Sequence, residues 1–216
     1  MNPNPDRVLL INKPMHWTSF DVVNKLRNQL KIKKIGHAGT LDPLASGLLI
    51  LCTGKFTKEI DSYQAQEKEY NGTMVLGQTT PSHDLETELT PAVSIEHITS
   101  DELEECRKKF IGKISQIPPL HSAIRINGRR AYEFAREGKE QVLKAREVLV
   151  SEFDWHVEFP TIHFRIVCSK GTYIRSLARD IGNELKVGAY LSSLCRTRIG
   201  NFKLSDAQTI EQVLLN

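Results

Sequence analysis

The stretch IHFRIVCSKGTYIRSLARDIGNEL, residues 162–185, carries the clearest structural signal in the chain. Over residues 162–167 every second side chain is a large apolar one, and this period of two predicts a strand. Ser169–Gly171 then supplies a turn. From Ile174 to Leu185 apolar residues recur every three or four positions, which predicts a helix. The stretch therefore predicts a strand, a tight turn and a helix.

The sequence on either side of this stretch predicts further short strands and helices. Thr18 and Asp21 form a capping-box pattern ahead of apolar residues at helical spacing. We expect strands at Val8–Ile11, Leu48–Cys52 and Tyr70–Leu76. We expect helices over residues 19–31 and 129–138, and a third helix that Ser100 caps and Gly112 closes. The strands are too irregularly spaced for an α/β barrel or a doubly wound sheet. No repeat or linker divides the chain, so we predict one mixed domain whose sheet pairs distant segments.

Length and composition place the chain among ordinary globular proteins. It has 216 residues, of which 40% are hydrophobic and 25% charged, which excludes disordered and collagen-like chains. The longest apolar stretch, Leu48–Cys52, is far shorter than the roughly 20 residues of a membrane span. Met1–Asp6 lacks the basic and apolar regions of a signal peptide. We therefore expect a soluble cytoplasmic protein with no membrane partner.

The sequence contains no recognisable metal or cofactor motif. The four cysteines lie at least 27 residues apart and have no histidine at a ligand spacing. A Walker loop, a Rossmann fingerprint and a Ser-His-Asp order are also missing. We expect reduced thiols, no metal and no cofactor.

Charge is distributed in blocks that the net charge of +3 conceals. Residues 1–58 carry 9 Lys and Arg against 3 Asp and Glu, residues 59–105 carry 1 against 12, and residues 106–148 carry 11 against 4. Solvated faces are the ordinary interpretation of such blocks. Clustered Lys and Arg also bind phosphate backbones by releasing counterions, so polyanion binding is the second interpretation.

The loop from Gly36 to Gly47 places glycines, a histidine and an acid directly before a buried strand. Such a loop can bring its backbone close to a ligand. Asp42 is the candidate for chemistry, although an aspartate before proline commonly starts a turn. His37 is a candidate for ligand contact, and a loop histidine is its ordinary interpretation.

Arg175 occupies the first turn of the expected helix, where the helix dipole disfavours a cation by about 0.3–1 kcal/mol. A nearby phosphate, or a carboxylate such as Asp42, would offset that cost; a solvent-exposed arginine is the alternative. Tyr70 and Tyr173 can stack on a nucleobase or pack in the core. Lys13 is interpreted either as a phosphate contact or as a surface lysine.

Taken together, these residues give the chain a resemblance to the bacterial tRNA pseudouridine-55 synthases of the TruB family, over nearly its whole length. The runs that carry it are Asn12–Pro14 with Thr18–Ser19, GHAGTLDP at 36–43, Tyr70 in its strand, QIPPLHSA at 116–123, and CSKGTYIR at 168–175. The resemblance implies an α+β fold with a mixed, mainly antiparallel central sheet flanked by helices and loops. We expect a single catalytic domain over residues 1–216. The chain departs here from longer members of the family, because we expect no separate C-terminal RNA-binding domain.

The resemblance implies an isomerase that converts uridine-55 in the T arm of tRNA to pseudouridine. The target nucleotide must leave its stack before a side chain can reach it. Asp42 would be the catalytic aspartate and Arg175 would pair with it, which favours the ionised carboxylate. Tyr70 would stack on the target base and could assist proton removal at C5.

The remaining roles implied by the resemblance concern binding. His37 would fill the stack that the flipped nucleotide leaves, and the other substrate-binding residues would be Lys13, Tyr173 and Leu194. We assign the RNA face to basic residues of the two positive blocks, namely Lys31, Lys33, Lys34, Arg125, Arg129 and Arg130. The expected partner is tRNA, with no obligate protein partner and a monomeric enzyme.

Two further departures from the family pattern and several alternatives accompany this interpretation. His121 stands where the family commonly has tyrosine, and residues 79–88 lack a glycine-bearing turn. Asp42 has three open roles: attack on the base, attack on the ribose carbon, or removal of a sugar proton. The alternative functions are a non-catalytic factor that binds structured RNA or folds tRNA, suggested by the basic blocks, and a phosphoryl-transfer enzyme, which the missing phosphate loop disfavours.

Overall fold

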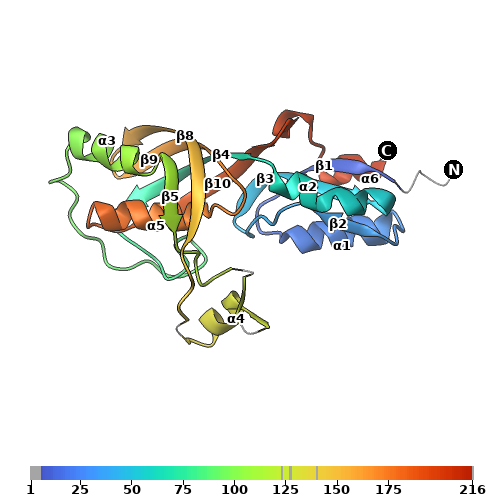
Figure 1. Ribbon diagram of the computed structural model, residues 1–216, viewed down its shortest axis with the longest axis horizontal. Coiled ribbons are helices and arrows are strands. Elements are labelled where there is room, and N and C mark those ends of the chain that lie inside the picture. Colours follow the sequence, from blue (N-terminus) through green and yellow to red (C-terminus); the bar gives the residue numbers. More distant parts are fainter. Residues whose placement is uncertain (1–5, 123, 127, 140, 216) are drawn as a thin grey trace. The chain divides into compact units, whose positions relative to one another are not determined.

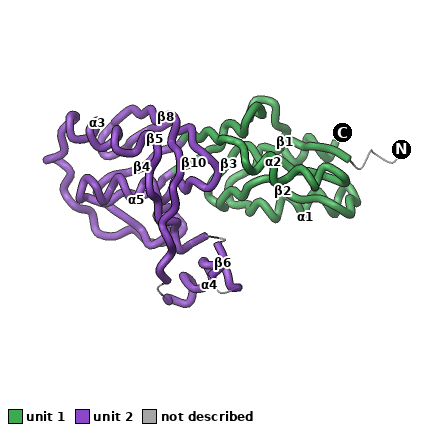
Figure 2. Tube along the Cα trace, viewed as in Figure 1, with its two compact units in different colours: residues 1–71, 193–216 green, residues 72–192 purple. Residues whose placement is uncertain are grey.

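The computed structural model describes residues 6–215 except residues 123, 127 and 140 (Figure 1). The expectations for Met1–Pro5, for position 123 of the QIPPLHSA run and for position 216 fall on residues outside this description. The chain divides into two compact units (Figure 2): unit 1 comprises residues 1–71 and 193–216, and unit 2 comprises residues 72–192. The boundary falls within β4 (Lys68–Leu76) and β10 (Ala189–Ile199), which contribute to both units.

The sheet of unit 1 is built around β3 (Ala45–Thr53). β1 (Val8–Lys13) and β2 (Ile35–His37) both pair with β3 in antiparallel fashion. Residues 194–196 of β10 pair with the start of β3 in parallel, and β11 (Phe202–Lys203) pairs with the end of β10. The start of β3 thus lies beside the late part of the chain.

Apolar clusters cover both faces of β3, as its continuous apolar sequence predicts. Leu49 and Leu51 belong to a cluster that α1 (Ser19–Gln29) and α6 (Ile210–Leu215) complete. Leu48 and Ile50 belong to a second cluster, against which side chains of α2 (Ile60–Ala65) and of the 3₁₀ helices η1 (Gly54–Glu59) and η2 (Leu204–Asp206) pack. The loop before β3 is therefore attached to a strand that is fixed from both sides.

The sheet of unit 2 has the strand order β10-β4-β9-β8-β5. β8 (Arg146–Glu158) pairs in antiparallel fashion with β9 (Thr161–Cys168) on one side and with β5 (Gly112–Gln116) on the other. Two longer helices, α3 (Ser100–Lys109) and α5 (Ile174–Glu184), belong to the same unit. The expected mixed and mainly antiparallel sheet with flanking helices is confirmed.

Helix α5 packs its apolar face into the core of unit 2. Ile174, Leu177, Ala178 and Ile181 are all buried, and a Cβ at Gly182 would collide with the backbone of residues 188–189. A small excursion carries β6 (Arg125–Ile126), β7 (Arg129–Arg130) and α4 (Ala131–Arg136), and it projects from the sheet of this unit (Figure 1). Among the described helices, none is both long and apolar enough to cross a membrane.

Three local predictions are corrected by the structure. Thr99, not Ser100, caps α3, because the reciprocal capping box needs Glu102 three residues after the cap. The helix expected over 129–138 is limited to α4, because Arg129–Arg130 pair as a strand. The loop expected over 36–47 begins and ends in strands, since Gly36 and His37 belong to β2 and β3 starts at Ala45.

Candidate active site

The loop that carries Asp42 is anchored to helix α1 in unit 1. The Leu41 amide donates to Oγ of Ser19 (2.8 Å), and the same hydroxyl donates to the Leu41 carbonyl (3.2 Å). The Ala45 amide donates to the Asp42 carbonyl (3.1 Å), which closes the turn into β3. Asp42 is half-buried. The loop therefore holds the carboxylate on a backbone that is bonded at both ends.

Lys13 lies at the end of β1 with its side chain fully buried. Its ammonium donates to the carbonyls of Pro14 (2.8 Å), Trp17 (2.6 Å) and Pro43 (3.5 Å), so it joins the segment after β1 to the Asp42 loop. Burial lowers the pKa of Lys13 to about 8; the Asp42 carboxylate opposes this shift. The interpretation as a surface lysine is wrong, and a substrate contact by Lys13 stays a prediction.

Arg196, on β10, is a second buried cation at this loop. Its guanidinium donates to the carbonyls of Leu48 (2.8 Å), Gly39 (3.1 Å) and Thr40 (3.4 Å), and the residue is 1% exposed. The register pairs Arg196 with Gly47, whose φ is +102°, and a Cβ at Gly47 would collide with the Arg196 backbone. The parallel pairing of β3 with β10 thus requires glycine and delivers the guanidinium to the loop.

The other predicted residues of unit 1 lie on strands near this loop or in its sheet. His37 is half-buried on β2, and burial, reinforced by Arg196, holds its pKa below the ordinary value. Leu194 on β10 is the register partner of Ala45, three residues after Asp42. Tyr70 is 8% exposed on β4. Unit 1 therefore brings Lys13, Leu194 and Asp42 together at the start of β3.

Arg175 is buried at the first turn of α5 in unit 2, with 3% exposure, so the solvent-exposed alternative is wrong. Its Nε lies 3.5 Å from Oδ2 of Asp84, which is also buried. Its two terminal nitrogens donate to the carbonyls of Ser82 (3.2 Å) and His121 (2.8 Å). A carboxylate does offset the charge at this helix start, as predicted. A pairing of Arg175 with Asp42 stays a prediction.

Tyr173 is the N-cap residue of α5 and is held by Gln116 at the end of β5. The Tyr173 amide donates to Oε1 of Gln116 (2.8 Å), and Nε2 of Gln116 donates to the Tyr173 carbonyl (3.1 Å). The adjacent Ile117 carbonyl accepts hydrogen bonds from Ser176 and Arg179 of α5, both at 2.9 Å. The QIPPLHSA run is therefore bonded to the first two turns of the helix that carries Arg175.

Two histidines lie beside this cluster of charges in unit 2. Burial lowers the pKa of His83 to about 4, and the positive charges of Arg179 and Arg175 act in the same direction, against Asp84. His83 is therefore neutral near pH 7. Its φ of +62° is uncommon for a residue other than glycine. His121 lies close enough to His83 to lower its pKa further and contributes its carbonyl to Arg175.

Sequence reasoning assigned no site role to three residues that organise these two clusters: Asp84, Gln116 and Arg196. Asp84 precedes Arg175 by 91 positions, and Arg196 follows Asp42 by 154. Local spacing therefore cannot predict that Asp84 pairs with Arg175 or that Arg196 binds the Asp42 loop. The local signal for Gln116 was its place at the start of the QIPPLHSA run. Within the described part of the chain, no group of three or more His, Cys, Asp or Glu side chains is arranged to hold a metal.

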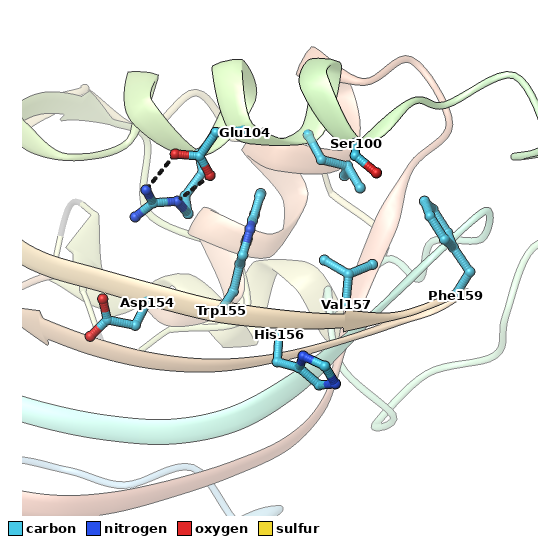
Figure 3. Close-up of a pocket in the computed structure, with 9 residues that line it drawn as sticks. Ser100, Glu104, Asp154, Trp155, His156, Val157 and Phe159 are labelled. Carbon is cyan, nitrogen blue, oxygen red and sulfur yellow. Dashed lines mark hydrogen bonds and ion pairs between the residues drawn. The ribbon is translucent and has the colours of Figure 1, made fainter.

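A pocket of about 580 Å³ in unit 2 is separate from these clusters. It lies between α3 and β8, where Trp155 and Val157 project toward the helix and His156 points away (Figure 3). Glu104 and Arg107 bind each other there through hydrogen bonds of 2.8 and 2.6 Å. The residues that line the pocket include no predicted site residue, so the pocket is not part of the candidate active site.

Known proteins similar to this chain agree on one family. Residues 27–174 match the "TruB family pseudouridylate synthase (N terminal domain)", and residues 175–215 match the "tRNA pseudouridylate synthase B C-terminal domain". A curated tRNA pseudouridine synthase B of Phocaeicola vulgatus is 50% identical over 218 residues, which cover 98% of this chain and 93% of that protein. The protein of that name from Parabacteroides distasonis is 52% identical over 213 residues, or 95% of this chain and 91% of that protein.

Solved structures of related proteins share the fold. A chain in the "Crystal Structure of a Cbf5-Nop10-Gar1 Complex" superposes with a TM-score of 0.75 at 31% identity over 96% of this chain and 53% of that one. A chain in the "Structure of H/ACA RNP bound to a substrate RNA containing 2'-deoxyuridine" gives 0.72 at 28% identity, over 99% and 54%. The chain thus spans about half the length of these solved chains. Because the family match covers more than half of the residues, and curated relatives are about half identical over nearly all of them, the chain belongs to the TruB family of pseudouridylate synthases, which are isomerases.

Proposed function

We propose that this protein converts uridine-55 in the T arm of tRNA to pseudouridine. The bond between N1 of the base and C1' of the ribose breaks, and a bond between C5 and C1' forms. C5 gives up its hydrogen and N1 takes up a proton, so the reaction is an isomerisation that needs no co-reactant. Curated relatives that bear the name tRNA pseudouridine synthase B support tRNA as the substrate.

One observation carries the proposal: Asp42 lies on an anchored loop in a chain that belongs to this family of synthases. Its loop is bonded to Ser19 and Ala45, and the buried Lys13 ammonium is close enough to interact with its charge. The ionised carboxylate is the form that can act as nucleophile or base. Attack on the base, attack on the ribose carbon and removal of a sugar proton all begin from that form.

We propose the following roles for the other predicted residues. Arg175 pairs with Asp42 when the substrate is bound, while Asp84 and two backbone carbonyls hold the guanidinium in place. Tyr70 stacks on the target base and assists proton removal at C5. The pocket is completed by Tyr173 and Leu194, and His37 fills the stack that the extruded nucleotide leaves.

Extrusion of the nucleotide costs a few kcal/mol, which stacking and phosphate contacts must offset. The basic residues that we assign to the RNA face are exposed in their units: Lys31, Lys33, Lys34, Arg125, Arg129 and Arg130. Arg129 also binds Glu133 and Glu137, so its charge is partly neutralised. We propose that the protein acts as a monomer and as one catalytic domain. We also propose that it acts in the cytoplasm, because its proposed substrate is a tRNA.

The direct test is incubation with an unmodified tRNA transcript labelled with tritium at C5 of uridine, in excess chelator. The proposal predicts tritium release and a single pseudouridine at position 55. A transcript with cytidine at that position should release none. RNA binding without release would support the alternative of a non-catalytic RNA-binding or tRNA-folding factor, and a requirement for metal would support phosphoryl transfer.

A further inference from the structure

Two residues from the sheet of unit 2 hold Tyr173 from different sides. Gln116 at the end of β5 and Arg146 at the start of β8 are register partners in the antiparallel pair. Gln116 is fully buried and bonds both the amide and the carbonyl of Tyr173. The sheet, and not the helix, therefore fixes the backbone of this N-cap residue, since no side-chain cap serves α5.

Arg146 holds the ring of the same tyrosine. The centre of its guanidinium lies 4.8 Å from the centroid of the Tyr173 ring, and a terminal nitrogen donates to the Gly171 carbonyl. A guanidinium at this distance from an aromatic face is attracted by the ring quadrupole. Among the described residues, Arg146 forms no ion pair with a carboxylate. Its contacts serve the turn and the ring.

The geometry leaves Tyr173 with limited freedom. Two hydrogen bonds fix its backbone, and the guanidinium occupies one face of its ring. A ring held in this way offers the opposite face for stacking and has little rotamer freedom left to lose when a base arrives. Stacking on aromatic rings stabilises bound bases, so a preorganised ring contributes directly to holding an extruded nucleotide.

We propose that Gln116 and Arg146 are positioning residues that hold Tyr173 with one ring face directed to the flipped nucleobase. This rests on the proposed function, because the base in question is the target uracil. Neither residue touches the reacting atoms in this proposal; both act through Tyr173. The turn that Arg146 bonds, at Gly171, is also the turn that leads into α5.

A double-mutant cycle tests this mode of action. Single-turnover rates and tRNA binding are measured for wild type, Arg146→Met, Tyr173→Leu and the double variant. We expect Arg146→Met to slow the single-turnover rate about tenfold with tRNA affinity changed less than about twofold. In the Tyr173→Leu background the same change should have almost no effect. If the two substitutions act independently, so that their effects on the single-turnover rate multiply in the double variant, the proposal is overturned.

A direct contact between Arg146 and an RNA phosphate is the main competing explanation. It predicts that Arg146→Met weakens binding, lowers the salt slope of the binding constant by about 1 and acts equally in the Tyr173→Leu background. Any of these three results would contradict positioning. Arg165→Met is the matched control, because Arg165 is a β9 residue of the same unit whose side chain is partly exposed and pairs with Glu152; it should leave both measurements unchanged.

Gln116 needs a separate design because it is fully buried. Gln116→Met keeps the length of the side chain and Gln116→Glu keeps its acceptor, so the two variants separate packing from hydrogen bonding. Thermal unfolding should show that both variants fold. We expect both to lose turnover, as Arg146→Met does. If wild type itself forms no pseudouridine, the proposed function fails and this inference fails with it; normal wild-type turnover with unaffected variants overturns the inference alone.

Discussion

Nε of Arg175 lies 3.5 Å from Oδ2 of Asp84, and the two side chains are 3% and 8% exposed. The arginine is in the first turn of α5, where the helix dipole opposes a cation. Asp84 supplies the opposing charge, and the Ser82 and His121 carbonyls take two further hydrogen bonds. The guanidinium is therefore held in one place by partners from two loops that are distant in sequence.

Asp84→Asn should destabilise the protein and slow the reaction. Removing one partner of a buried ion pair leaves an uncompensated charge and costs about 3 kcal/mol, which corresponds to a fall in Tm of about 10 °C for a chain of this size. Asp61→Asn, at an exposed residue of α2, is the matched control and should leave Tm unchanged. Equal Tm values for the two variants would show that the pair contributes nothing to stability.

Lys13→Met should change how stability depends on pH. The pKa of Lys13 is about 8 in the folded protein against 10.5 for an ordinary lysine, so between these values the unfolded chain binds the extra proton. Stability then rises with pH through this window, by about 3 kcal/mol at most. Urea unfolding of wild type should give a higher free energy of unfolding at pH 10 than at pH 7. Lys13→Met should lack this increase. The exposed Lys25→Met should behave as wild type, and a gain of the same size in Lys13→Met would contradict the assignment.

Arg196→Lys should loosen the Asp42 loop. Lysine keeps the charge but cannot reach Leu48, Gly39 and Thr40 together, so buried carbonyls lose their donors at a cost of about 1–3 kcal/mol each. We expect lower stability by urea unfolding and slower turnover. Arg198→Lys, two residues along β10 and paired with Glu67, is the control. Similar losses in both variants would remove the specific role of Arg196.

Local patterns predicted the elements that local forces determine. The capping box of Thr18 and Asp21 is present and α1 starts at Ser19. The alternating run before Ser169 is strand β9, and the apolar residues after it form the buried face of α5. The cap of α3 is Thr99 and not the predicted Ser100. Both residues have a high N-cap propensity, and the position of Glu102, three residues after Thr99, decides between them.

Contacts between distant segments were not predictable in the same way. The parallel pairing of β3 with β10 places Arg196 beside the Asp42 loop. Residues 45 and 194 are far apart in the sequence, so no local pattern predicts this pairing. The helix-dipole argument did predict an anion near Arg175, because that argument depends on local geometry. The identity of Asp84 as that anion depends on the path of a long loop.

The central claim is that the carboxylate of Asp42 performs the isomerisation. Single-turnover tritium release from 5-labelled uridine in a tRNA transcript tests it most directly, with Asp42→Asn and the control Asp61→Asn assayed beside wild type. We predict no detectable release for Asp42→Asn, with tRNA affinity within a few-fold of wild type, and full release for Asp61→Asn. Release by Asp42→Asn at the wild-type rate would contradict the claim.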